Sequence, residues 1–372
     1  MKVMVVMGTR PEAIKLAPVI SALRGAAVDT CVVSSGQHRE MLAQALSFFG
    51  IEPDLQADTM QPGQSLNGLA SRVLAAMDGL IEQVKPDWVL VQGDTTTAFC
   101  AGLAAFHRGV RIGHVEAGLR TGDLASPFPE EANRSLLARV ATRHFAPTSY
   151  ARDSLLREGI PAAGILVTGN SVVDAIEAVR ANWRQAAPSL RPELQGSAPQ
   201  ILVTCHRREN FGTVMLDICA MLRRLCARYP SFRWVFPVHL NPAVREPVMR
   251  ELAGIGNLQL IDPVDYPTSL FLISRSVLVV SDSGGIQEEA PTFGVPAVVM
   301  RNHTERREGV EAGFATLAGQ SAADIEAAVI AWLDHPERGA ALQGRPNPYG
   351  DGHASQRIVA SLLERPVEAF VG

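Results

Sequence analysis

The sequence predicts an α/β protein of two doubly wound domains that face each other across a cleft. In its first half, short β-branched runs alternate with longer segments of helical spacing, the order typical of parallel sheets with helices on both faces. Residues 186–200 interrupt this pattern with three prolines, a glycine and two serines, and the alternation then starts again. At 372 residues the chain is also long enough for two or three domains of roughly 150 residues.

The first half supplies four expected strands, each continuously apolar as strands covered on both faces are. They are Val3–Met7, Thr30–Val33, Trp88–Val91 and Ile112–Val115. Helical spacing is expected over Glu12–Leu23, Met41–Phe49, Leu66–Val84 and Thr97–His107. Ligands of such folds bind beyond the carboxyl ends of the strands, so residues directly after strands are the first candidates for function.

The second half repeats the arrangement without repeating the sequence. Its expected strands are Ile201–Thr204, Trp234–Val238, Leu258–Ile261, Val277–Val280 and Ala297–Met300, followed by a loop at Asn347–Gly352 and a final helix at Ala354–Leu363. We expect an N-terminal domain over residues 1–185, completed by the C-terminal helix of residues 353–372, and a C-terminal domain over residues 186–352.

Composition excludes several classes of function. The net charge of −4, from 34 basic and 38 acidic residues, argues against a general binder of nucleic acid or of membrane surfaces. The apolar N-terminus is followed at once by Gly8–Glu12, which favours a first strand over a signal peptide. The five cysteines form no CxxC pair, so we expect a reducing compartment, the cytoplasm. Neither GxGxxG nor metal-ligand spacing occurs, so no cofactor or metal is expected.

The first candidate site is Gly8–Lys15, directly after the first expected strand. Pro11 suits a first helical turn. Arg10 and Lys15 then lie near the positive end of a helix dipole, which is unfavourable unless an anion is bound there. The alternative is that both side chains reach into solvent or pair with Glu12.

Acidic residues follow the next two expected strands. Asp94 comes after one strand and Glu116 ends the next, while Glu130, Glu131 and Arg134 follow in a loop. Asp94 also suits a helix cap, and Glu130 and Glu131 suit a first helical turn. Carboxylates that converge in a desolvated cleft repel one another, which raises the pKa of at least one and suits it to acid–base catalysis.

The expected C-terminal domain shows similar signals. His206 and Arg207 follow its first strand, although at least one arginine of Arg207-Arg208 fits a solvated face. Ser283, Gly284 and Gly285 start a helix whose backbone N–H groups suit a phosphate, and Glu289 lies one turn later, where it suits ribose hydroxyls. A helix capped by Ser283 is compatible with this role. Arg301, Arg306 and Arg307 add cations after the next strand.

These motifs, in this order, resemble the non-hydrolysing UDP-N-acetylglucosamine 2-epimerases of bacteria. The similarity runs nearly end to end, through GTRPEAIKLAP, QHREML, MQPGQ, GDTTT, GHVEAGLRTGD, SPFPEEANR, HRREN, PVHLNPAVREPV, SDSGGIQEEAP and NPYGDG. It implies two Rossmann-like domains of the GT-B type found in many glycosyltransferases, a homodimer, and a nucleotide held mainly by the second domain. It also implies interconversion of UDP-GlcNAc and UDP-ManNAc by elimination of UDP and its re-addition to a bound 2-acetamidoglucal.

The resemblance also assigns roles to residues of this chain. The acid–base carboxylates correspond to Asp94, Glu116 and Glu130, with Glu131 and Arg134 close by, and a catalytic or phosphate-contacting histidine corresponds to His206. The UDP contacts correspond to Arg10, Lys15, Ser283, Gly284, Gly285, Glu289 and Arg306. A second UDP-GlcNAc that activates bacterial members would meet Gln37, Gln64, Arg207 and His239.

Three positions depart from the family pattern, and several alternatives stay open. Ser269 stands where a phenylalanine near the uracil is usual, so either Phe271 takes over this role or the uracil is stacked more weakly. Arg307 replaces a proline, and Cys205 replaces a glycine or threonine. The alternatives are a hydrolysing 2-epimerase that releases ManNAc and UDP, an epimerase of a diacetamido-uronic acid nucleotide, an inverting glycosyltransferase, and a catalytically silent UDP-sugar sensor.

Overall fold

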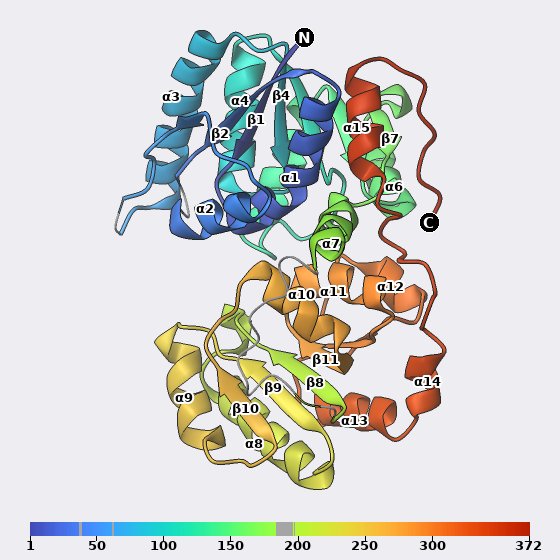
Figure 1. Cartoon of the computed structure of the whole chain (residues 1–372). Helices are drawn as coiled ribbons and strands as arrows, with labels where there is room; N and C mark the ends of the chain where they lie inside the picture. The colour runs from blue at the N-terminus through green and yellow to red at the C-terminus, as the bar shows by residue number, and fades with distance from the viewer. Residues whose placement is uncertain (37–38, 62, 184–195, 197) are drawn as a thin grey trace. The chain divides into compact units, whose positions relative to one another are not determined.

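A computed structural model describes residues 1–36, 39–61, 63–183, 196 and 198–372 of the chain (Figure 1). The chain divides into two compact units. The N-terminal unit comprises Met1–Ala178 and Tyr349–Gly372, and the C-terminal unit comprises Val179–Pro348. The division falls inside helix α7 (Ser171–Asn182), so a continuous helix connects the first unit to the second.

The N-terminal unit contains a seven-stranded sheet in the order β3-β2-β1-β4-β5-β6-β7. Every neighbouring pair is parallel, and the strand order reverses between β1 and β4. The loops after β1 and β4 therefore flank the switch point at which ligands of doubly wound sheets bind. The strands are β1 (Lys2–Met7), β2 (Asp29–Ser34), β3 (Leu55–Gln56), β4 (Trp88–Gln92), β5 (Arg111–Val115), β6 (Arg143–Ala146) and β7 (Ile165–Val167).

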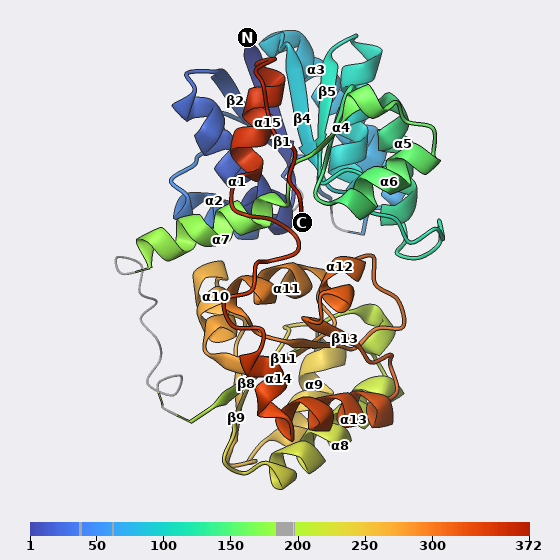
Figure 2. The ribbon, with the colours of Figure 1, turned by 90° about the vertical axis from the view of Figure 1, so that its right-hand side faces the viewer.

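Helices cover both faces of this sheet. Besides α7, they are α1 (Arg10–Gly25), α2 (Arg39–Phe48), α3 (Leu66–Val84), α4 (Thr96–His107), α5 (Glu130–Val140), α6 (Ser149–Arg157) and α15 (Ala354–Leu362). Apolar side chains of α3, α4 and α5 join Met4, Val6, Val89 and Val91 in one buried cluster. Helices α1 and α15 pack side by side although they come from opposite ends of the chain (Figure 2).

The C-terminal segment is fixed to the N-terminal unit by a buried carboxylate. Asp174 of α7 accepts hydrogen bonds from the backbone N–H of Ser355 at 2.8 Å and from the Ser355 hydroxyl at 2.6 Å. The backbone N–H of Ala354 is a third donor, at 3.2 Å. Asp174 thereby caps the start of α15, which explains why residues after Pro348 rejoin the first unit.

The C-terminal unit contains a six-stranded parallel sheet in the order β10-β9-β8-β11-β12-β13. Its strand order reverses between β8 and β11. The strands are β8 (Gln200–Thr204), β9 (Arg233–Pro237), β10 (Leu258–Ile261), β11 (Ser276–Ser281), β12 (Ala297–Val299) and β13 (Ala315–Leu317). The helices are α8 (Thr213–Arg228), α9 (Pro242–Leu252), α10 (Tyr266–Ser274), α11 (Gly284–Glu289), α12 (Arg307–Glu311), α13 (Ala322–Leu333) and α14 (Pro336–Ala340).

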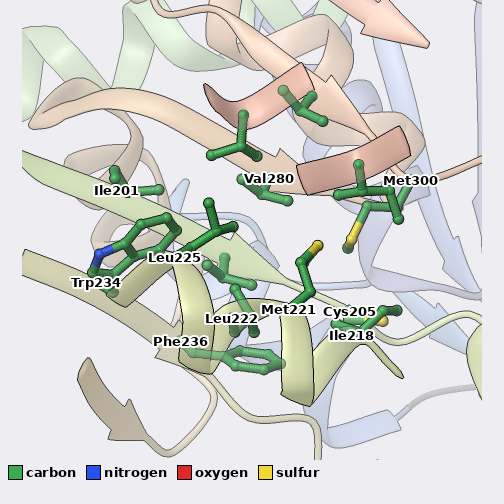
Figure 3. Packing of buried hydrophobic residues seen from close by; sticks show 14 of the residues in the cluster. Ile201, Cys205, Ile218, Met221, Leu222, Leu225, Trp234, Phe236, Val280 and Met300 are labelled. Atoms are coloured by element: carbon green, nitrogen blue, oxygen red, sulfur yellow. The ribbon is translucent and has the colours of Figure 1, made fainter. Parts of the chain in front are cut away.

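The core of the C-terminal unit forms where α8 packs on the sheet (Figure 3). Ile218, Leu222 and Leu225 of α8 are fully buried, as are Trp234 and Phe236 of β9. The apolar residues of α8 recur at helical spacing and so form one continuous stripe against the strands. Among the residues that the structure describes, no helix is long and apolar enough to span a bilayer.

Two buried histidines lie on adjacent strands of the N-terminal sheet. His114 of β5 and His144 of β6 are directly paired in the parallel ladder, and both side chains are excluded from solvent. Burial lowers the pKa of His114 to about 3 and the pKa of His144 to about 4. Both rings are therefore neutral in the folded protein at neutral pH.

This pair predicts a loss of stability in mild acid. Between pH 6.5 and about 4, the unfolded chain takes up protons at both histidines while the folded chain does not. The free energy of unfolding should fall by about 1.4 kcal/mol per pH unit for each group. Urea unfolding at a series of pH values measures the slope, which His144→Leu should roughly halve. His335→Gln, at a side chain that is 60% exposed, should leave the slope unchanged; an unchanged slope in His144→Leu would contradict the assignment.

Candidate active site

Glu116 lies where β5 ends, at the carboxyl edge of the N-terminal sheet. Its backbone has φ of +63°, a left-handed conformation that is uncommon outside glycine and is typical of functional sites. The carboxylate is buried: Lys15 Nζ lies 2.6 Å from Oε1, and the Gln92 side chain donates to Oε2. A buried glutamate in a strained backbone at a strand end is held in one orientation, as acid–base catalysis requires.

Asp94 follows β4, the strand next to β5. The sequence left open whether Asp94 merely caps α4, and that alternative is wrong, because Thr95 is the cap and its hydroxyl accepts from the Ala98 N–H. The Asp94 carboxylate instead lies 3.3 Å from the Arg134 guanidinium. The preceding Gly93 has φ of +71°, and its carbonyl oxygen lies 2.7 Å from His114 Nε2. The turn that carries Asp94 is thus fixed from both sides.

Arg134 links Asp94 to Glu131. Glu131 and Arg134 form an ion pair at 2.6 Å, and both side chains are almost fully buried. Glu131 also accepts from the backbone N–H groups of Thr121 and Gly122, which fixes the loop between Glu116 and α5. Glu131 therefore does more than place a favourable negative charge in the first turn of α5. Glu130, the first residue of α5, is half-buried and forms no ion pair with any residue that the structure describes.

The environment of Lys15 explains how one of the two cations near the start of α1 is neutralised. Its side chain is buried against Glu116, so part of the anion predicted from the sequence is a carboxylate of the chain itself. Arg10 occupies the first position of α1 and is half-buried.

Glu12 is a structural residue of this edge that sequence reasoning did not select. Its buried carboxylate accepts from the N–H groups of Gly8 and Thr9 and, at 2.6 Å, from the Thr95 hydroxyl. Burial raises the pKa of Glu12 although these hydrogen bonds oppose the rise. Glu12 therefore joins the loop after β1 to the loop after β4 across the switch point. The capping-box pattern Thr9-x-x-Glu12 was the available signal.

His206 lies directly after β8, beside the switch point of the C-terminal sheet. Its Nδ1 lies 3.0 Å from Oδ1 of Asp282, which follows β11. The His239 ring stacks on the His206 ring with centroids 6.2 Å apart. Asp282 is a second residue that sequence reasoning did not select, although it falls within the SDSGG run.

Arginines gather near the predicted phosphate loop of the C-terminal unit. A Cβ added to Gly284 would lie 2.7 Å from Arg306 Cζ, so the glycine lets the guanidinium rest against the start of α11. Arg306 in turn pairs with Glu288 and Glu305. Burial and the neighbouring Arg301 lower the pKa of Arg207. The Nε of Arg207 is buried without a hydrogen-bond partner among the described residues.

The other predicted UDP residues surround the same loop. Ser283 is the cap residue of α11 but makes no capping hydrogen bond with its side chain. The carboxylate of Glu289 lies next to Gly285, at 3.7 Å from the position of an added Cβ. Arg307, one of the departures from the family pattern, is exposed and lies 3.8 Å from Glu311.

Phe271 of α10 belongs to an aromatic group that includes a residue missed in the sequence. The Trp183 ring lies 5.8 Å from the Phe271 ring and 6.2 Å from the Phe293 ring. Trp183 follows α7 directly, outside any motif, so no local pattern pointed to it.

The predicted activator residues are divided between the units. Gln64 belongs to the N-terminal unit and accepts from Arg72, whereas Arg207 and His239 belong to the C-terminal unit. Gln37 lies outside the described residues. Within the described part of the chain, no cluster of His, Cys, Asp and Glu side chains has the arrangement of a metal site.

Known protein sequences match this chain over nearly its full length. The family model described as UDP-N-acetylglucosamine 2-epimerase matches residues 21–363. A UDP-N-acetylglucosamine 2-epimerase of Yersinia pestis is 47% identical over 375 residues, covering 99% of this chain and 100% of that protein.

Solved structures agree with the sequence comparison. The crystal structure of a UDP-GlcNAc 2-epimerase from Neisseria meningitidis bound to UDP-GlcNAc has a TM-score of 0.94 and 43% identity, covering 98% of this chain and 100% of that chain. A glycotransferase of kitacinnamycin, with a TM-score of 0.63 at 14% identity and coverage of 98% and 99%, shares the fold alone.

The predicted fold class, two Rossmann-like α/β domains of the GT-B type, is confirmed by the two parallel sheets and by these neighbours. The resemblance drawn from the motifs is confirmed as well, because both sequence matches span nearly the full chain. The chain belongs to the UDP-N-acetylglucosamine 2-epimerase family.

Proposed function

We propose that this chain interconverts UDP-GlcNAc and UDP-ManNAc without net hydrolysis. A base removes the C2 proton while the C1–O bond to UDP breaks, which leaves UDP and a 2-acetamidoglucal. UDP then adds back to C1 and a proton returns to the opposite face of C2. Electrons return to the carbon they left, so the route needs no redox cofactor.

The observation that carries this proposal is the carboxylate network at the ends of β4 and β5. Glu116 is paired with Lys15, and Asp94 is linked through Arg134 to Glu131. Two faces of C2 require two proton-transfer groups. Glu116 and Asp94 supply carboxylates held by Lys15 and Arg134, and half-buried Glu130 supplies a third carboxylate. We assign these three residues to acid–base catalysis, with Glu131 and Arg134 as the pair that holds Asp94.

We assign the binding of UDP mainly to the C-terminal unit. Backbone N–H groups at Gly284 and Gly285, with Arg306 beside them, suit the diphosphate, and Glu289 suits the ribose. Burial and the positive charges of Arg301 and Arg306 lower the pKa of Arg207, and a bound diphosphate would neutralise this positive charge. Ser283, Phe271 and His206 complete this set, and the family resemblance adds Arg10 and Lys15 to the proposed UDP contacts.

Gly284→Ala tests the phosphate loop. The new Cβ would lie 2.7 Å from Arg306 Cζ and would displace the guanidinium, so the Kd for UDP should rise about tenfold, as the loss of one charge-assisted contact predicts. Titration calorimetry with UDP measures it. Gly339→Ala, where nothing lies within 4 Å of the added Cβ, is the matched control and should bind UDP as before. If both variants bind UDP with the same Kd, Gly284 is not part of the UDP site.

Proton NMR in D₂O tests the reaction itself. UDP-GlcNAc incubated with the purified protein should gain deuterium at C2 while UDP-ManNAc accumulates. Free ManNAc with UDP would indicate the hydrolysing alternative instead. An unchanged spectrum would contradict the proposal and would favour another sugar nucleotide or a sensor.

We also propose the activator role for a second UDP-GlcNAc. The buried Nε of Arg207, which has no hydrogen-bond partner among the described residues, and the exposed ring of His239 support a polar ligand at the carboxyl ends of β8 and β9. Gln37 and Gln64 are assigned to this ligand by the family resemblance alone. A sigmoidal dependence of rate on UDP-GlcNAc, made hyperbolic by His239→Ala, is the expected signature.

Two broader properties complete the proposal. Helices α3, α4 and α5 carry the exposed apolar side chains Leu66, Phe106 and Leu136, and a homodimer that buried them would remove this apolar surface from water. All five cysteines are free thiols, which supports a cytoplasmic enzyme. Light scattering of the purified protein tests the dimer, and cell fractionation tests the location.

A further inference from the structure

Asp282 collects an unusual number of hydrogen bonds at the switch point of the C-terminal sheet. Its side chain is 0% exposed. The backbone N–H groups of His206 and Arg207 donate to Oδ2, each at 2.9 Å. The Asn210 amide donates to the same oxygen at 2.9 Å, and the Cys205 thiol does so at 3.3 Å.

The remaining oxygen faces the imidazole of His206. His206 Nδ1 lies 3.0 Å from Asp282 Oδ1, while the His206 side chain as a whole is 43% exposed. An ionised carboxylate only accepts hydrogen bonds, so Nδ1 must carry a proton to make this contact. The second ring nitrogen, Nε2, is then the one available to a ligand.

Asp282 remains ionised in this environment. Burial by itself raises the pKa of Asp282, but the His206 ring and the N–H groups of Arg207 and His206 outweigh it, and the pKa lies well below its ordinary value. The thiol next to it responds in the opposite sense: burial and the Asp282 charge raise the pKa of Cys205. The carboxylate therefore acts as a fixed acceptor.

We propose that Asp282 is a positioning residue for His206: it fixes the ring orientation and the Nδ1–H tautomer, so that Nε2 is presented to the reaction. The contact crosses from the end of β11 to the end of β8, the two strands that flank the switch point. This inference rests on the proposed function in that it takes His206 to act on the leaving UDP.

The tautomer can be measured without any variant. In protein labelled with ¹⁵N-histidine, long-range ¹H–¹⁵N spectra distinguish protonated from unprotonated ring nitrogens. The His206 signals are assigned by their disappearance in His206→Ala. We expect Nδ1 to be protonated in the wild-type protein; an unprotonated Nδ1 overturns the proposal, whatever the enzyme catalyses.

Asp282→Asn tests the consequence for the reaction. The new carboxamide can turn its oxygen to the backbone N–H groups, which places its NH₂ opposite Nδ1 and requires the Nε2–H tautomer. We expect that switch in the spectrum and a fall in kcat of roughly 10²-fold with KM within about threefold. Asp262→Asn, the same change at an exposed aspartate paired with Arg245, should alter neither.

A double-mutant cycle separates positioning from a structural role. If Asp282 acts through His206, Asp282→Asn should change kcat by less than about threefold when His206 is already alanine. A full hundredfold loss in that background overturns the proposal. Full activity of His206→Ala would instead refute the assigned role of His206 and leave the tautomer measurement valid.

Discussion

Glu116→Gln is expected to lower kcat by roughly 10²–10⁴-fold while the Kd for UDP stays within a few-fold. The amide has nearly the shape of the carboxylate and can still meet Lys15 and Gln92, but it cannot accept a proton at neutral pH. UDP lacks the sugar carbon on which Glu116 is proposed to act, so the affinity for UDP reports on the nucleotide site alone. A loss confined to kcat thus assigns proton transfer to this residue.

The measurement combines steady-state kinetics with deuterium exchange at C2. Asp94→Asn should show the same pattern because Asp94 is another carboxylate to which we assign proton transfer. Glu82→Gln is the matched control: it removes one exposed charge from a pair with Arg108 and should leave turnover unchanged. Full activity in Glu116→Gln would refute the assignment, whereas lost UDP binding would point to damage beyond the carboxylate, such as a displaced Lys15.

The fold was predictable where strands are buried on both faces. Such strands are continuously apolar, and for this reason β1, β4, β5 and β8 were expected within one residue of their observed ends. The short strands β3, β6, β7 and β13 were not predicted. β6 begins with an arginine and a histidine, Arg143 and His144, so its composition does not show that it is an interior strand paired on both sides.

The site was predictable in its positions but not in its pairings. Topology places residues after parallel strands at the carboxyl edge of their sheet, which selected Asp94 and Glu116 in the N-terminal unit and His206 in the C-terminal unit. No local pattern reveals that Lys15 pairs with Glu116, since the two are 101 residues apart. The same holds for Asp282 and His206, 76 residues apart along the chain. The carboxylates of Glu116 and Asp282 contact residues from distant parts of the chain, and only the folded structure shows which residues these are.

Gly118→Ala is expected to reduce the free energy of unfolding of the N-terminal unit by about 3 kcal/mol or more. Gly118 has φ of +96°, and an added Cβ would lie 2.2 Å from the carbonyl oxygen of Ala151 in α6. The atom it meets belongs to a helix backbone and cannot turn aside. Either α6 or the loop after β5 must move, and that loop carries Glu116, so kcat should fall together with stability.

Gly159→Ala separates the clash from the backbone strain. Gly159 has a comparable φ of +81°, yet nothing lies within 4 Å of its added Cβ. It should therefore lose only the cost of a left-handed alanine, about 1 kcal/mol, with kcat unchanged. Urea unfolding of both variants gives the difference, which measures how closely α6 packs against the loop of Glu116. Equal losses of stability would mean that the contact between Gly118 and α6 does not hold the loop of Glu116 in place.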